Sequence, residues 1–270
     1  MKQSWFKTAL PHILAIGMFL LIACFYCLPA LQGKVLEQHD IIGWKGGAQQ
    51  SFEFKEKYGH FPLWTNSMFG GMPAYTIAYD GPGLQTIYLQ AVFTLGLPVP
   101  ISFFFLACVC FYFLCQVFRV NPYISAAAAI GYAYASFDPI IIAVGHNTQM
   151  MAIAYAPAVI GSLVLIFQRR YLLGLTLLSL FFGLQIATQH IQVVYYTSIT
   201  MLTIGAAYVV NAIREKQTNT ILPAAGTALL AGILGLCTYA ITWYPLQEYS
   251  KETMRGGKSE LTQADNSNKS

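Results

Sequence analysis

Residues 150–168 read MMAIAYAPAVIGSLVLIFQ, a run without a single charged side chain. An α-helix needs about 20 consecutive apolar residues to cross a bilayer, so this stretch predicts a transmembrane helix. The whole chain of 270 residues has the same character, because 56% of its residues are hydrophobic and only 10% are charged. Soluble domains carry about 25% charged residues. The composition therefore predicts an all-α polytopic membrane protein.

Apolar runs on both sides of this stretch are also long enough to be spans. The sequence predicts seven in all, at about 9–31, 98–118, 123–142, 150–168, 171–189, 191–211 and 221–243. Residues 84–97 are too short for a span and predict an interfacial helix. We therefore expect a membrane module over residues 1–243. Residues 244–270 are expected to form an extracytoplasmic tail that is partly disordered and truncated.

The basic residues predict the orientation of these spans. Cytoplasmic loops are enriched in lysine and arginine. In a seven-span arrangement one side of the membrane receives Lys2, Lys7, Arg119, Arg169, Arg170, Arg214 and Lys216. The N-terminus is then cytoplasmic, and the long polar segment 32–83 is an extracytoplasmic loop. Because the cytoplasmic loops are too short to build a site, we expect any chemistry on the outer face.

Several classes of function receive no support from the sequence. The net charge of +4 is modest and gives no reason to expect nucleic-acid binding. Nucleotide-binding glycine motifs are not found, and the six cysteines lie inside apolar runs. The histidines and carboxylates come from separate loops without the close spacing of metal ligands. No cofactor is identified, and a divalent metal, although compatible with the residues, is not indicated.

Asp40 lies at the head of the 32–83 loop, beside His39, which is a candidate substrate-binding residue. A carboxylate close to the bilayer surface can have its pKa tuned by partial desolvation and can act as a general base. The alternative is a helix N-cap, because Asp is a favoured capping residue and Ile41 follows directly. Farther along the loop, residues 47–58 predict an amphipathic helix on the membrane surface.

The 61–75 segment of the same loop combines prolines and glycines with exposed aromatic residues, Trp64 among them, and with Asn66. Glycines allow a close backbone approach, and aromatic rings suit a sugar face or a lipid chain. Trp64 and Asn66 are therefore candidate substrate-binding residues. A packed loop without a ligand is an equal alternative.

Two further polar clusters fall between predicted spans on the same outer face. His146 and Gln149 follow the third span, and His190 and Gln192 follow the fifth. Ionisable groups near membrane depth are costly and usually face a cavity or a partner, so these four are candidate substrate-binding residues. An ordinary re-entrant turn is the alternative for the His146 cluster, and hydrogen bonding between helices is the plainer alternative for the His190 cluster.

The tail after the last span carries two cations, Arg255 and Lys258. An arginine fork and a lysine point charge can both bind a phosphate. Contact with solvent or lipid headgroups is the simpler alternative for these two side chains.

Several separated motifs resemble the YfhO family of bacterial membrane proteins. They are Asp40 after the first span, WKGGAQQ at 44–50, PLWTNSMFGGMP at 62–73, GHNTQ at 145–149, and QHIQ at 189–192 with Tyr195 and Tyr196. The resemblance extends from the first span to about Leu261. Members of the family are typically much longer, so the chain resembles an N-terminal portion.

The resemblance implies a function, since YfhO proteins are similar to glycosyltransferases of the GT-C fold. It implies a GT-C-like module in the bacterial inner membrane, a polyprenyl-phosphate-linked sugar as donor, and a cell-envelope glycan, glycolipid or protein as acceptor. Asp40 stands where that family context implies a catalytic acidic residue. A lipid-linked glycan flippase and a non-catalytic membrane scaffold are the alternatives.

Overall fold

The structure is a computed structural model that describes residues 5–78 and 84–253. Over these residues the chain forms twelve α-helices and one two-stranded antiparallel hairpin. The helices are α1 (Trp5–Tyr26), α2 (Leu28–Leu31), α3 (His39–Tyr58), α4 (Leu84–Phe93), α5 (Ile101–Val117), α6 (Pro122–Ala133), α7 (Phe137–Val144), α8 (Asn147–Phe167), α9 (Tyr171–Ala187), α10 (Ile191–Arg214), α11 (Ile221–Cys237) and α12 (Ala240–Ser250). The strands are β1 (Trp64–Thr65) and β2 (Met72–Pro73), and short 3-10 helices are η1 (Ala74–Thr76) and η2 (Thr218–Thr220).

The apolar helices confirm the predicted all-α, multi-pass class. Within the described residues, four stretches are long and apolar enough to cross a membrane: α1, α8, α10 and η2 with α11. The pair α6 and α7 makes a fifth if it is counted as one bent span. Helices α5 and α9 are apolar but have only 17 residues each. All seven predicted runs fall on these helices, whereas the count of seven spans and the GT-C-like arrangement stay predictions.

The structure corrects three of the predicted span boundaries. The first span ends at Tyr26, and a separate short helix, α2, follows with Pro29 in its first turn. The run 123–142 is broken, because α6 and α7 meet at an angle of 41°. Pro139 lies in the first turn of α7, where its missing N–H costs no helical hydrogen bond. The last span ends at Cys237, and α12 begins at Ala240.

Helix α8, which contains most of the uncharged run 150–168, lies at the centre of the bundle. Of its apolar window, 78% is buried, and it packs chiefly against α5 and α9. Glycines allow this close packing: a Cβ on Gly174 of α9 would lie 2.5 Å from the Ile166 side chain. In contrast, only 6% of the α10 window is buried. Membrane helices associate through such small-residue contacts.

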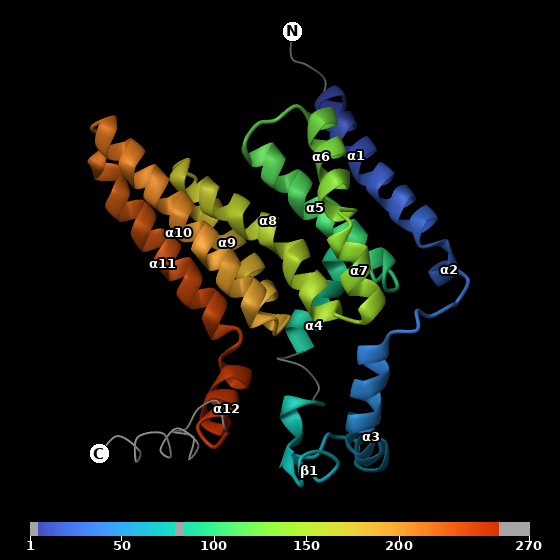
Figure 1. Cartoon of the computed structure of the whole chain (residues 1–270). Helices are drawn as coiled ribbons and strands as arrows, with labels where there is room; N and C mark the ends of the chain where they lie inside the picture. The colour runs from blue at the N-terminus through green and yellow to red at the C-terminus, as the bar shows by residue number, and fades with distance from the viewer. Residues whose placement is uncertain (1–4, 79–83, 254–270) are drawn as a thin grey trace, which may run out of the picture.

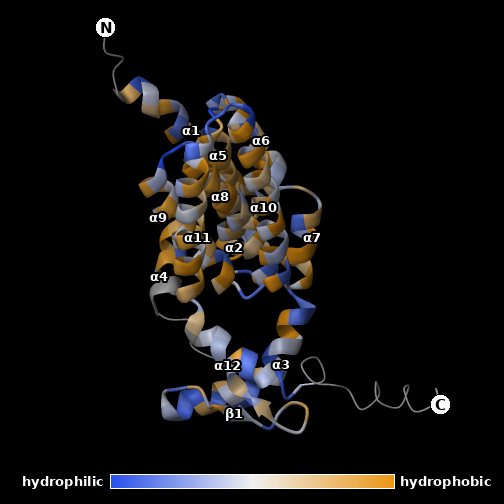
Figure 2. Ribbon diagram, turned by 90° about the vertical axis from the view of Figure 1, so that its left-hand side faces the viewer, coloured by the Kyte–Doolittle hydropathy of each residue, from blue (hydrophilic) through white to orange (hydrophobic). Residues whose placement is uncertain are grey.

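The polar elements gather at one end of the bundle. In both views α3, the hairpin and α12 lie beyond the same end of the apolar helices, and the N-terminus lies at the other end (Figures 1 and 2). Figure 2 shows orange, hydrophobic helices in the bundle and more blue and white residues in α3 and the hairpin. A hydrogen bond connects α12 to η1, the short helix that follows the hairpin: the Tyr75 hydroxyl in η1 donates to the Pro245 carbonyl in α12 over 3.3 Å. This end carries the candidate site.

Candidate functional site

The site begins where α3 starts. Gln38 is the N-cap residue, with an extended backbone and no side-chain capping bond, and the helix starts at His39. Asp40 therefore lies in the first turn, where the helix dipole favours a carboxylate. The capping alternative for Asp40 is wrong, because the helix begins one residue before it. The helix predicted at 47–58 is the second part of α3, and its placement on the membrane surface stays a prediction. Helix α3 ends at Tyr58, and Gly59 follows as the C-cap residue in a left-handed conformation.

The second part of the site is the turn between α7 and α8. Gly145 has a φ of +113°, a backbone conformation that side chains with a Cβ rarely adopt. A Cβ at this position would lie 3.2 Å from both the Asp40 Cβ and the Ile41 Cγ1. The first turn of α3 is therefore seated directly on the glycine. His146 follows as the N-cap residue of α8.

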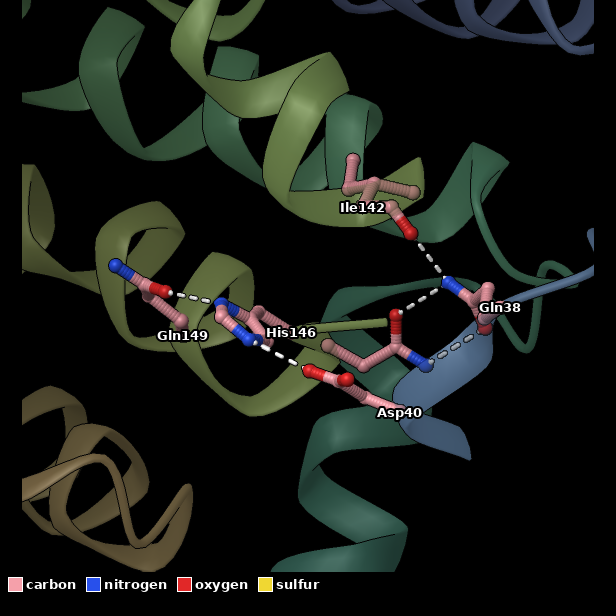
Figure 3. Close-up of polar contacts among 6 residues, drawn as sticks. Gln38, Asp40, Ile142, His146 and Gln149 are labelled. Atoms are coloured by element: carbon pink, nitrogen blue, oxygen red, sulfur yellow. Dashed lines mark hydrogen bonds and ion pairs between the residues drawn. The ribbon is translucent and has the colours of Figure 1, made fainter. Parts of the chain in front are cut away.

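An ion pair joins the two parts, as Figure 3 shows. The His146 Nε2 lies 2.7 Å from the Asp40 Oδ2, and its Nδ1 lies 3.1 Å from the Gln149 Oε1. Both ring nitrogens thus lie within hydrogen-bonding distance of side-chain oxygen atoms, which fixes the orientation of the ring. The His146 and Asp40 side chains are 46% and 52% exposed, so a solute can reach them. A carboxylate that a hydrogen bond keeps in place and that a solute can reach is suited to general-base chemistry.

Gln38 also connects the first turn of α3 to the α7–α8 turn, and we call this contact between the two turns the junction. Gln38 lies on its buried side. Its side chain is 6% exposed and donates from Nε2 to the Ile142 carbonyl and, over 3.1 Å, to the Asn147 Oδ1. The Asn147 amide donates back to the Gln38 Oε1 over 3.5 Å (Figure 3). Gln38 and Gly145 are the residues that sequence reasoning missed. Gly145 belongs to the GHNTQ motif, but nothing local indicates what either residue contacts, because their partners lie more than 100 residues away along the chain.

The third predicted cluster reaches the junction through His190. This residue is the N-cap of α10, and its Nε2 is buried with no hydrogen-bond partner among the described residues. Burial lowers the pKa of His190, and the electrostatic influence of His146 lowers it further. In the same cluster, the Gln185 Nε2 donates to the Ala152 carbonyl over 3.0 Å, which is a helix contact of the plainer kind.

Other candidate residues that the structure describes take no part in the hydrogen bonds of the ion pair. His39 is exposed at the start of α3. Gln192 is exposed on the first turn of α10 and donates to the Tyr196 hydroxyl over 3.2 Å. Arg255 and Lys258 lie outside the described residues.

Trp64 and Asn66 lie in and beside the β1–β2 hairpin. The Trp64 Nε1 donates to the Asn66 Oδ1 over 3.1 Å, and the Asn66 backbone N–H donates to the Gln50 Oε1 over 3.2 Å. Gln50 is ten residues along α3 from Asp40, a rise of about 15 Å. The hairpin is thus packed on the distal part of α3, and a substrate contact by Trp64 and Asn66 stays a prediction.

A hollow adjoins the junction on the side of the first span. It has a volume of about 320 Å³ and lies between the end of α1, residues 34–36 and one face of α7. Its lining is apolar apart from Lys34, and it includes Ile142, whose carbonyl accepts from Gln38. The candidate site therefore combines a polar pair with a neighbouring apolar hollow.

Two observations complete the description of the site. Within residues 5–78 and 84–253, no group of three or more His, Cys, Asp or Glu side chains is arranged to hold a metal ion. Comparison of the chain with protein-family models, curated proteins and solved structures finds no match.

Proposed function

We propose that the protein is a membrane glycosyltransferase of the GT-C type that moves a sugar from a polyprenyl phosphate to a cell-envelope acceptor. The observation that carries the proposal is the Asp40–His146 pair, with 2.7 Å between the Oδ2 and Nε2 atoms. Two segments that are far apart in the sequence place these half-exposed groups at the polar end of the bundle. We further propose that this end faces the outside of the bacterial inner membrane, as the basic residues predict.

In the proposed reaction Asp40 is the general base. His146 holds one carboxylate oxygen by a charge-assisted hydrogen bond, and this leaves the Oδ1 atom to accept the proton of the acceptor hydroxyl. The hydroxyl oxygen then forms a bond to the anomeric carbon of the sugar. The bond from that carbon to the phosphate oxygen breaks, and its electron pair leaves with the polyprenyl phosphate. Displacement from the opposite face inverts the anomeric centre.

The apolar hollow beside the junction suits the donor. A polyprenyl chain is apolar and would occupy the space between α1 and α7, and the Lys34 ammonium would attract the phosphate. The donor phosphate would then lie near the Gln38 end of the junction. Most of the rate enhancement would come from positioning the two substrates and stabilising the charge on the leaving group.

A non-catalytic scaffold is the second candidate, because the same ion pair also docks α3 on the bundle. A lipid-linked glycan flippase has less support. Ion-coupled transporters usually place charged residues near the bilayer midplane, and the centres of α8 and α10 carry none. The two leading candidates differ in whether the Asp40 carboxylate must accept a proton.

The test replaces Asp40 by Asn, which still accepts a hydrogen bond from the His146 Nε2 but is a far weaker base. If Asp40 is the general base, glycosylated envelope product should fall by roughly a hundredfold or more. The measurement is mass spectrometry of envelope glycans from cells that carry only the variant, with membrane insertion checked by immunoblot. Glu53→Gln is the control, since Glu53 is an acid on the same helix that lies distant from the pair. An unchanged glycan profile with Asp40→Asn would refute the catalytic role and favour the scaffold.

A further inference from the structure

A long apolar groove lies on the side of the bundle formed by α10 and α11. It has a volume of about 520 Å³ and is walled by α8, α9, α10 and α11. Small residues open it, and a Cβ on Gly232 would meet no atom within 4 Å. Along α11 its lining runs from Ile221 to Leu236, a rise of about 22 Å. The groove is therefore longer than the hydrocarbon region of one leaflet, because the two leaflets together have a hydrocarbon core of about 30 Å.

A polar hollow, which we call the mouth, adjoins the groove at the end of the bundle where α8 ends. It has a volume of about 210 Å³ and shares Phe167, Val209 and Ile221 with the lining of the groove. The Arg169 guanidinium lines this mouth and donates to the Gln217 side chain. The Phe167 ring forms one wall, where it stacks on Tyr208 with 4.5 Å between ring centroids.

Positive charge predominates on the two turns beside the mouth. Arg169 and Glu215 line the mouth with opposite charges, and the same turns also carry Arg170, Arg214 and Lys216, which do not line it. Arginine and lysine next to a membrane span attract anionic lipid headgroups, and an arginine fork matches phosphate oxygens. The groove is apolar and longer than one leaflet, and the turns beside its mouth are rich in cations. This arrangement matches an amphipathic molecule with one negatively charged headgroup.

We infer that this groove and its mouth form a binding site for an anionic phospholipid, with the phosphate at Arg169 and one acyl chain between α10 and α11. The site is separate from the proposed reaction centre. Helix α8 runs from Asn147 beside the ion pair to Phe167 at the mouth, so the two sites are about 30 Å apart along it. In the orientation we propose, the lipid comes from the cytoplasmic leaflet.

Native mass spectrometry of the detergent-purified protein tests the site. The probes are dioleoyl phosphatidylglycerol and dioleoyl phosphatidylcholine, added separately at equal concentration. We expect the wild-type protein to retain one phosphatidylglycerol with roughly tenfold preference, because a hydrogen bond to a charged group is worth at least that factor. Arg169→Gln should remove the preference, and Arg169→Lys should keep most of it. Arg119→Gln is the matched control, since Arg119 also follows a helix end on the basic side but does not line the mouth.

A second pair of variants tests the groove. Gly232→Phe should fill it and reduce retention of both lipids, whereas Gly226→Phe should have no effect, because Gly226 is equally open but does not line the groove. Equal retention of the two lipids by the wild-type protein would overturn the inference, as would equal losses from Arg169→Gln and Arg119→Gln. A dimer that Gly232→Phe dissociates would also overturn it, because a second copy would then fill the groove.

Discussion

At the scale of single residues, the junction depends on a glycine and on two histidines with different surroundings. Glycine is the only residue type that both adopts a φ of +113° at position 145 and leaves room for the Asp40 Cβ. His146 is half-exposed and bonded to a carboxylate, whereas the His190 ring is partly buried with an unpaired nitrogen. The same side-chain type is therefore paired with a carboxylate at one position and has a pKa lowered by burial at the other.

Replacing Gly145 by Ala should weaken the docking of α3. The new Cβ would press on Asp40 and Ile41 in a strained backbone conformation, and such strain costs about 1–3 kcal/mol. We expect a lower thermal midpoint of the detergent-solubilised protein and faster proteolysis near the start of α3. Gly17→Ala is the control, because Gly17 lies inside α1 with no atom within 4 Å of an added Cβ. Equal midpoints for the two variants would contradict the seating of α3 on Gly145.

His190 should make stability depend on pH. Its pKa in the folded protein lies below the ordinary value of 6.5, so the unfolded chain binds the proton first as the pH falls. The stabilising contribution is complete above about pH 6.5 and is lost as the pH drops toward the folded pKa. Thermal midpoints measured from pH 7.5 downward should fall less steeply in His190→Asn than in the wild-type protein. Parallel curves would show that His190 is not buried as described.

At the scale of elements, α3 is held at its start and at its middle by different partners. Its first turn rests on the α7–α8 turn. Its middle contacts the hairpin through Gln50 and through the Ser67 hydroxyl, which donates to the Gly47 carbonyl over 2.6 Å. Helix α3 therefore connects the hairpin to the bundle, and the two contacts can be disrupted separately.

Gln38→Ala should loosen only the first of these contacts. It removes the bonds to Ile142 and Asn147 and leaves buried polar groups without partners, which costs about 1–3 kcal/mol. Hydrogen exchange should become faster in the first turn of α3 and at the start of α8, while the hairpin stays protected. Gln49→Ala is the matched control, because Gln49 is exposed and bonds only to Glu53 within the helix. Uniformly faster exchange across the whole loop would mean that α3 has no separate anchor.

At the scale of the whole molecule, the two ends of the bundle have different chemistry. The reaction centre that we propose, α3, the hairpin and α12 lie at one end, and the N-terminus with the basic turns lies at the other (Figure 1). Helix α8 spans the distance between them and is the most buried of the span-length helices. The sidedness of the membrane thus decides which end meets extracytoplasmic substrates.

Cysteine labelling should reveal that sidedness. In a background without the six native cysteines, Leu63→Cys reports on the hairpin end and Asn219→Cys on the basic end, because both positions are exposed. A membrane-impermeant maleimide added to intact spheroplasts should label Leu63→Cys at once and Asn219→Cys only after lysis. Labelling in the reverse order would overturn the proposed orientation and, with it, an extracytoplasmic site.

The sequence by itself determined the helical membrane class, because burial of apolar residues in lipid depends on local composition and leaves a pattern readable along the chain. It also placed Asp40, His146 and His190 at turns between apolar runs. Only the tertiary structure decided that Asp40 pairs with His146, that Gln38 and Gly145 hold them together, and that Trp64 and Asn66 lie farther away on the hairpin. Those contacts join segments about a hundred residues apart, and they depend on the bend before α7 and on one missing Cβ, which local composition does not encode.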